Sequence, residues 1–143
     1  MNALVTLPVL LPLIGAGASI VAGGSKVAQR GIALAVLVAV TAMSVALVVI
    51  VDRDGTIVVQ GGGWSAPVGI TLVADRLSAM MLAVASIMLL AVLVFAIGQP
   101  GAERNHVGFQ SVYLILASGV ALSFLPGDLF NLFVGFEMML TAS

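Results

Sequence analysis

Long apolar runs without a charged side chain make up most of the chain. Four of these runs are long enough to span a bilayer, and they cover residues 3–25, 31–51, 77–98 and 107–125. A helix needs about 20 apolar residues to cross about 30 Å of hydrocarbon. Because lipid offers no hydrogen-bond partners, each run must satisfy its own backbone groups, as a helix does. The pattern therefore predicts four transmembrane helices.

The first run is predicted to be a membrane helix although it contains Pro8 and Pro12. Only Met1 and Asn2 precede it, whereas a secretory signal begins with a positively charged region and has a shorter apolar core. Membrane helices tolerate proline where neighbouring groups satisfy the carbonyls that proline leaves free.

A fifth apolar run covers residues 129–143. As a helix it rises about 22 Å, which is less than the hydrocarbon thickness. We therefore expect this helix to be truncated and the sequence to be part of a longer chain. The alternative is a short protein whose last helix is half-inserted.

The longest connection, residues 52–76, separates the second and third runs. Residues 56–60 and 68–73 are strand-like, and Gly61–Gly63 lie between them, which predicts a β-hairpin. The glycines lack the following Lys-Ser/Thr of a phosphate-binding loop. Trp64 is interpreted as an anchor at the membrane interface.

Composition supports a membrane protein and excludes several other classes. The chain is 62% hydrophobic and 8% charged, whereas soluble domains carry about 25% charged residues. A net charge of −1 gives no basic surface for nucleic acid. The absence of cysteine and the single histidine leave no ligand set for a metal or cofactor. We therefore expect neither a metal nor a cofactor, and no enzymatic active site.

The lysines and arginines predict an orientation. The first connection, 26–30, and the third, 99–106, lie on the same side of the membrane if all four helices cross it. They carry three Lys or Arg residues, and the opposite side carries two. The positive-inside rule then places these two connections in the cytoplasm and the hairpin outside.

Glu137 is the single ionisable residue within the apolar runs. It follows Leu129 by eight positions, or about 12 Å along a helix axis, which places it near the bilayer midplane. An acid there costs about 2.5–3.5 kcal/mol on insertion scales and is functional by default. We interpret Glu137 as a proton relay. The alternative is a polar residue that holds two helices together, and Thr141, one turn later, is the neighbour able to form a hydrogen bond.

Other polar residues are accessory candidates. Asp128 and Asp75 each precede an apolar run and are interpreted as helix N-caps. For Asp128, with Asn131 at the third helical position, a role at the mouth of a proton pathway is the alternative. His106 lies in a loop or at a helix start, and proton pick-up is its functional interpretation.

A family resemblance rests on three segments. Residues 125–143, LPGDLFNLFVGFEMMLTAS, resemble the fifth-helix region of the D subunit of the Mrp-type multisubunit monovalent cation/proton antiporter. Residues 62–79 and 7–13 also resemble that protein. The D subunit is similar in turn to the antiporter-like subunits of respiratory complex I.

The resemblance implies an all-α integral membrane fold with a hairpin between helices 2 and 3. Residues 1–143 would form a single membrane segment, the N-terminal part of a protein of about 14 helices. It further implies that Glu137 matches a glutamate that pairs with a lysine on the seventh helix, beyond this sequence.

The implied function is that of one component of a sodium/proton antiporter, a secondary transporter that serves sodium export and pH homeostasis. Its expected location is the plasma membrane of a bacterium. Its expected partners are other antiporter subunits, the lipid bilayer, protons and sodium.

Two other functions stay open. One is a proton-pumping subunit of complex I or of a membrane-bound hydrogenase, in which case the chain would belong to an NADH:quinone oxidoreductase or a similar enzyme. Those subunits usually carry Trp directly before the acid, where this chain has Phe136. The other is a small standalone transporter or a structural subunit.

Overall fold

The structure is a computed structural model that describes residues 2–64, 68–99, 101 and 108–143. Its helices and strands follow one another in an order that places a hairpin between the second and third long helices, as predicted. The elements are α1 (Asn2–Val21), α2 (Lys26–Asp54), β1 (Ile57–Gln60), η1 (Gly61–Gly63), β2 (Thr71–Ala74), α3 (Arg76–Gly98), α4 (Phe109–Phe124) and α5 (Leu129–Ala142).

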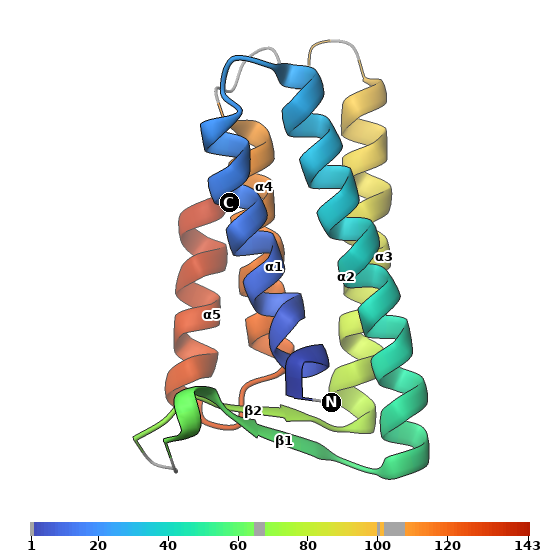
Figure 1. The fold of residues 1–143 in the computed structure, drawn as a ribbon, viewed down its shortest axis with the longest axis vertical. Helices are drawn as coiled ribbons and strands as arrows, with labels where there is room; N and C mark the ends of the chain where they lie inside the picture. The colour runs from blue at the N-terminus through green and yellow to red at the C-terminus, as the bar shows by residue number, and fades with distance from the viewer. Residues whose placement is uncertain (1, 65–67, 100, 102–107) are drawn as a thin grey trace.

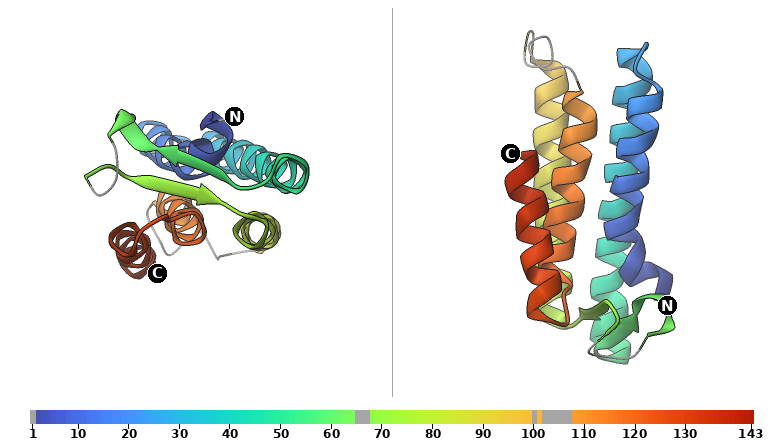
Figure 2. Two further views of the ribbon diagram at one scale, coloured as in Figure 1. Left: turned by 90° about the horizontal axis from the view of Figure 1, so that it is seen from below. Right: turned by 90° about the vertical axis from the view of Figure 1, so that its left-hand side faces the viewer.

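The helices stand side by side in two layers. α1 and α2 form one layer, and α3, α4 and α5 form the other (Figures 1 and 2). Contacts between α1 and α4 and between α2 and α3 join the layers. Within the described ranges, α1, α2 and α3 are long and apolar enough to cross a membrane, whereas α4 and α5 are shorter apolar helices.

The first connection differs from its predicted position. Residues 26–30 are not a loop, because α2 begins at Lys26. The Ser25 side chain caps this helix by accepting a hydrogen bond from the Ala28 N–H at 3.3 Å, and α1 has already ended at Val21. The apolar run 31–51 indicates only the part of α2 that can lie in hydrocarbon. The helix itself continues beyond this run at both ends, through the charged turns 26–30 and 52–54.

The α4 span is also shorter than predicted. The apolar run 107–125 predicts a full crossing, but the helix covers Phe109–Phe124, 16 residues. Its N-cap position is Gly108, whose φ of 84° is left-handed and departs from helical geometry. Residues 102–107 lie outside the described part of the chain.

The proline-containing helix α1 is tied to α4 by a buried hydrogen bond. The Ser118 hydroxyl donates to the Val9 carbonyl at 2.7 Å. Pro12 cannot donate to the Pro8 carbonyl, and the Ser118 bond satisfies the next carbonyl along the chain. That neighbouring groups satisfy the carbonyls left free by the two prolines stays a prediction, since this bond reaches the carbonyl next to the one freed by Pro12.

The hairpin closes one end of the helix bundle. β1 and β2 pair antiparallel, with Ile57 opposite Ala74 and Gln60 opposite Thr71. Alternate residues of both strands are buried in a core shared with α1, α2, α3 and α4. The N-terminus and the connection between α4 and α5 lie at this same end, whereas the turn between α1 and α2 lies at the other (Figure 1).

The connection between α4 and α5 docks on β2. The Val73 N–H donates to the Leu125 carbonyl and the Gly127 N–H donates to the Thr71 carbonyl, both at 2.8 Å. A Cβ on Gly127 would lie 2.8 Å from Thr71 Cγ2, so glycine permits this approach. The hairpin therefore sets where α5 begins.

Candidate functional site around Glu137

Asp128 fixes the start of α5. Its Oδ1 accepts a hydrogen bond from the Asn131 N–H at 2.7 Å, and its Oδ2 accepts one from Asn131 Nδ2 at 2.6 Å. The bond from the Asn131 backbone N–H is the main cause that lowers the pKa of Asp128. The capping interpretation of Asp128 is confirmed, and a role in a proton pathway stays a prediction.

The buried side of α5 packs closely on α4. Asn131 and Gly135 are the buried residues of α5. A Cβ on Gly135 would lie 2.7 Å from Ser123 Oγ, and one on Gly119 would lie 3.1 Å from the Gly135 carbonyl oxygen. Small residues thus let the two backbones approach, and this contact determines the rotation of α5 about its axis.

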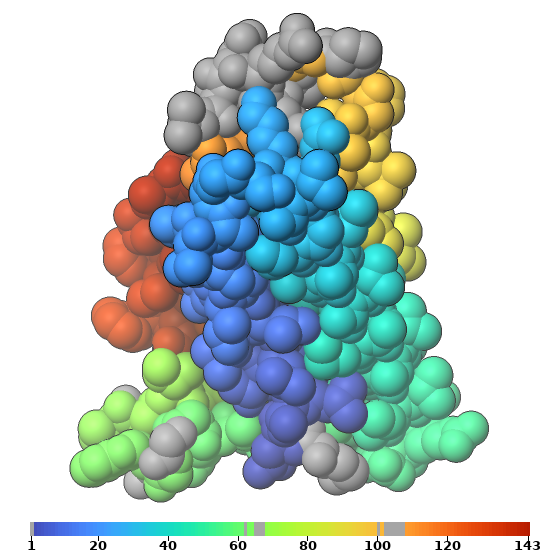
Figure 3. Space-filling model, turned by 45° about the horizontal axis from the view of Figure 1, so that its top comes forward, coloured from blue at the N-terminus to red at the C-terminus, as the bar shows by residue number. Residues whose placement is uncertain are grey.

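Glu137 lies on the exposed surface of α5. Phe133, Phe136 and Leu140 are also exposed, with 59%, 51% and 69% of their surface accessible. α5 packs mainly against α4 and lies at the edge of the molecule when viewed from the α1 side (Figure 3). The result is a single carboxyl group on an apolar helix surface.

The carboxylate of Glu137 has no hydrogen-bond or ion-pair partner among the residues that the structure describes. The Thr141 hydroxyl donates at 2.8 Å to the backbone carbonyl of Glu137, not to its side chain. Thr141 is therefore adjacent to the acid in the helix without binding its carboxyl group.

Asp75 caps α3 at the hairpin end of the bundle. Asp75 Oδ1 accepts from the Ser78 N–H at 2.6 Å, and the Asp75 N–H donates to Ser78 Oγ at 2.8 Å, which forms a capping box. The Ser78 backbone bond is the main cause that lowers the pKa of Asp75. The capping prediction is confirmed for this residue too.

The structure brings only some of the predicted residues together. Asp75 and Asp128 both flank the hairpin end, whereas Glu137 lies about 12 Å along α5 from its first residue. His106 lies outside the described residues. The sequence analysis missed the ion pair between Asp52 and Arg76, whose Oδ1 and Nη2 are 3.1 Å apart. The hairpin joins their helices, which is the one signal that could have suggested it.

Comparison with known proteins shows sequence similarity to the D subunits of antiporters. No family model matches the chain. Over all 143 residues it is 43% identical to the D subunit of the Na(+)/H(+) antiporter of Alkalihalophilus pseudofirmus and 34% identical to a putative antiporter subunit mnhD2 of Staphylococcus epidermidis. The chain is homologous to the antiporter D subunit. It spans 29% of the length of these relatives.

Solved structures agree with this relationship. The fold matches a chain of the Mrp complex from Dietzia sp. DQ12-45-1b with a TM-score of 0.90 and 32% identity, covering 99% of this chain and 27% of that one. It also matches a chain of an archaeal membrane-bound sulfane sulfur reductase with a TM-score of 0.89 at 24% identity, a similarity of fold alone. The predicted Mrp-like helical fold with its hairpin is confirmed.

Proposed function

We propose that the chain belongs to one component of a multisubunit sodium/proton antiporter and that Glu137 carries a proton in it. The observation that supports this most directly is the similarity to the antiporter D subunit over all of this chain, combined with one carboxyl group on an apolar membrane helix. The substrates are then protons and sodium. The partners are the other subunits of the antiporter, and the location is a bacterial plasma membrane.

The position of Glu137 suits a proton relay for a physical reason. An ionisable group at mid-membrane depth is costly in lipid and is found where it faces a polar partner or water. Tight packing on α4 holds α5 in place, so Glu137 keeps a defined direction as its charge changes. In the relatives, the rest of a protein more than three times as long is available to cover this surface.

The proposed mechanism is electrostatic. Proton binding neutralises Glu137 and removes a negative charge from the exposed surface of α5. A cation facing that surface, which the family resemblance suggests to be a lysine, then loses its counter-charge and releases its own proton more readily. Repeated along the membrane, such steps would couple proton movement to sodium export and pH homeostasis.

Substitution of Glu137 by Gln tests the proposal in the antiporter complex that contains this chain. Gln keeps the shape of the side chain but cannot titrate. We expect Glu137→Gln to lose most sodium-driven proton exchange in inverted membrane vesicles and to lower the sodium tolerance of cells that depend on the complex. Glu137→Asp keeps an acid and should retain more exchange than the Gln variant.

Leu140→Met is the matched control, because this residue lies on the same exposed surface one turn later and does not titrate. It should exchange ions at the wild-type rate, and immunoblots should show equal amounts of all variants in the membrane. Wild-type exchange by Glu137→Gln would contradict the proposed role.

A proton-pumping subunit of a respiratory complex is the second candidate, since the sulfane sulfur reductase chain shares the fold. Phe136, in place of the Trp usual before the acid in the complex I subunits, favours the antiporter. The two functions separate by their energy source. Exchange in vesicles driven by a sodium gradient alone supports the antiporter, whereas proton uptake that requires an electron donor supports the respiratory complex.

A further inference from the structure

The hydroxyl group of Ser19 is buried without a hydrogen bond. Ser19 lies in the last turn of α1, and none of its surface is accessible. Its Oγ has no hydrogen-bond partner among the residues that the structure describes. Ser44 of α2 shows the usual arrangement for a serine within a helix, because its hydroxyl donates to the Val40 carbonyl four residues earlier at 2.7 Å. Ser19 lacks such a bond, although it is equally buried.

Gln110 of α4 lies opposite Ser19. α1 leads away from the hairpin end and α4 leads toward it, so the two helices are antiparallel (Figure 1). A Cβ on Gly15 would lie 3.2 Å from Leu114 Cδ1, which is one point of contact between them. Ser19 comes one turn after Gly15 in α1. Gln110 comes one turn before Leu114 in α4, so both lie about 6 Å beyond that contact in the same direction. With 3% of its surface accessible, Gln110 is also buried.

Neighbouring side chains leave the two oxygen atoms unsatisfied. Gln110 forms another interaction, but its Oε1 is buried and accepts no hydrogen bond from the described part of the chain. Gln29 of α2 donates from Nε2 to the backbone carbonyl of Ser19 at 3.2 Å. It thereby satisfies a carbonyl at the end of α1, where helical donors run out, and does not bind the hydroxyl group. Buried polar atoms without a hydrogen bond destabilise a fold, so a missing partner is expected here.

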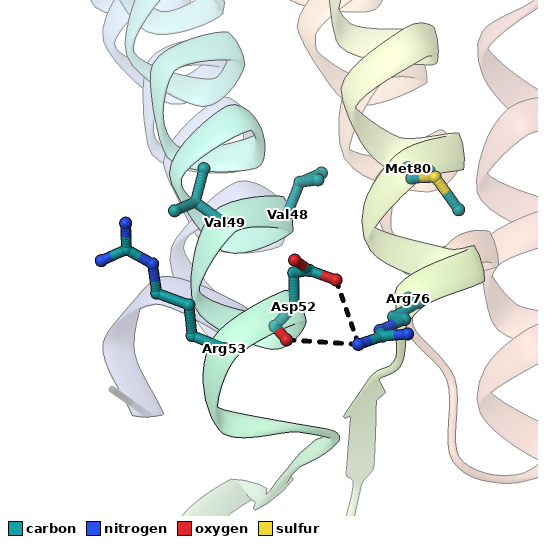
Figure 4. A pocket seen from close by; sticks show the side chains of 6 residues that line it. All are labelled: Val48, Val49, Asp52, Arg53, Arg76 and Met80. Atoms are coloured by element: carbon teal, nitrogen blue, oxygen red, sulfur yellow. Dashed lines mark hydrogen bonds and ion pairs between the residues drawn. The ribbon is translucent and has the colours of Figure 1, made fainter.

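The polar groups of the surface pocket at the hairpin end of the bundle differ in this respect. Arg76 Nη2 donates to Asp52 Oδ1 at 3.1 Å and to the Asp52 carbonyl at 3.3 Å (Figure 4). Both side chains are also largely exposed, with 70% and 69% of their surface accessible. These groups bind each other and solvent, and their geometry requires no further ligand.

We propose that a water molecule is bound between Ser19 and Gln110 and joins α1 to α4. The water accepts a hydrogen bond from the Ser19 hydroxyl and donates one to Gln110 Oε1. A hydroxyl group can donate whereas an amide oxygen only accepts, so the bridging molecule must both accept and donate, as water does. Buried waters bind in this way to polar groups that the protein leaves unsatisfied. The site lies at the ends of two helices, close to the solvent beyond the membrane.

A cryo-electron microscopy map of the antiporter complex that contains this chain tests the proposal, at a resolution that shows ordered water. We expect a peak at about 2.8 Å from both Ser19 Oγ and Gln110 Oε1. Three results would overturn the proposal: no peak there in a map that shows other waters, the shorter oxygen contacts of a metal ion, or a Ser19 hydroxyl that donates to the Gly15 carbonyl.

Ser19→Ala and its matched control Ser44→Ala test the source of the peak. Both replace a fully buried serine within a helix, but the Ser44 hydroxyl already binds a carbonyl of its own helix. The peak should be lost in Ser19→Ala and kept in Ser44→Ala. A peak that persists in Ser19→Ala would contradict the assignment of the hydroxyl as a ligand.

Thermal denaturation of the same complex in detergent, followed for this subunit, gives a test that needs no map. If water binds the hydroxyl, Ser19→Ala should denature at a lower temperature than Ser44→Ala. If the hydroxyl is unsatisfied, its removal should stabilise the subunit and raise the denaturation temperature, which would overturn the proposal.

Gln110→Met tests whether one water serves both residues, because Met has a similar shape and no amide oxygen. The double variant Ser19→Ala, Gln110→Met should lower the denaturation temperature by less than the sum of the two single variants, since either substitution alone already breaks the bridge. Additive shifts would show that the two residues share no ligand.

Discussion

At the scale of single residues, two aspartates determine where helices begin. Asp75 and Asp128 accept hydrogen bonds from backbone N–H groups at the starts of α3 and α5, and these bonds lower the pKa of both. A helix N-terminus leaves backbone donors unpaired, which is why a short acceptor immediately before an apolar run is a strong sequence signal. Both residues were therefore recognisable without tertiary information.

Loss of the Asp128 cap should destabilise the start of α5. Asp128→Ala removes both bonds to Asn131, and we expect a cost of about 1 kcal/mol. Asp128→Asn, with an amide oxygen that can still accept from the backbone N–H, should cost less. Unfolding of the detergent-solubilised chain with dodecyl sulfate, followed by circular dichroism, measures the difference. Equal stability of Asp128→Ala and wild type would contradict the capping role.

The same bonds predict a pH dependence. Because the pKa of each aspartate is lower in the folded chain than in the unfolded one, the unfolded state binds protons first as the pH falls. The capping contribution is fully present above about pH 4 and is lost as the pH falls through the folded pKa, below the ordinary value of 3.8. Stability measured from pH 6 to pH 2.5 should show this loss, and the double variant Asp75→Asn, Asp128→Asn should show a smaller one.

At the scale of elements, close helix contacts depend on small residues. Gly119, Ser123 and Gly135 form the contact between α4 and α5, and Gly15 of α1 approaches the Val36 side chain of α2. Small residues four positions apart, such as Gly119 and Ser123 in α4, form a pattern that favours close helix contacts. It did not predict that Gly135 of α5 is the residue opposite, because that depends on how two separate helices pack.

Gly135→Ala should loosen the contact between α4 and α5. Its Cβ would lie 2.7 Å from Ser123 Oγ and 3.1 Å from the Ser123 backbone nitrogen, so the helices must separate, at a cost of about 1–3 kcal/mol. Gly17→Ala in α1 is the control, since its Cβ would meet nothing within 4 Å. Dodecyl sulfate unfolding should show a loss for Gly135→Ala alone, and equal stability of the two variants would show that the contact is loose.

At the scale of the whole molecule, the hairpin organises one end of the bundle. β2 pairs with β1, binds the connection between α4 and α5, and leads directly into the capped start of α3. The turn between α1 and α2 lies at the opposite end (Figure 1). The two ends therefore lie on opposite sides of a membrane that the long helices cross, and the positive-inside rule predicts the hairpin side to be extracytoplasmic.

The chain offers a direct test of this orientation because it contains no cysteine. Val58→Cys places a thiol on the exposed side of β1, and Gly24→Cys places one in the open turn between α1 and α2. In intact cells a membrane-impermeant maleimide should label the Val58 position, and the Gly24 position only after permeabilisation. The reverse pattern would invert the predicted orientation.

The sequence by itself determined the membrane class, the order of the helices and the apolar part of each, the hairpin, both aspartate caps and the presence of one acid among apolar residues. These features depend on local composition and on neighbours within one turn, where hydrocarbon and unpaired backbone groups impose strict requirements. The charged turns that lengthen α2 escaped this reasoning, because an apolar run marks the hydrocarbon and not the helix.

Only the tertiary structure decided that the α4–α5 connection docks on β2, that Arg76 pairs with Asp52, and that Glu137 lies on the side of α5 away from α4. Each of these depends on which distant segments pack together and at what rotation. In a water-soluble protein, the apolar face of an amphipathic helix turns toward the core and fixes the rotation of the helix about its axis. These helices are apolar on all sides, so small residues and interhelical hydrogen bonds set their rotation instead.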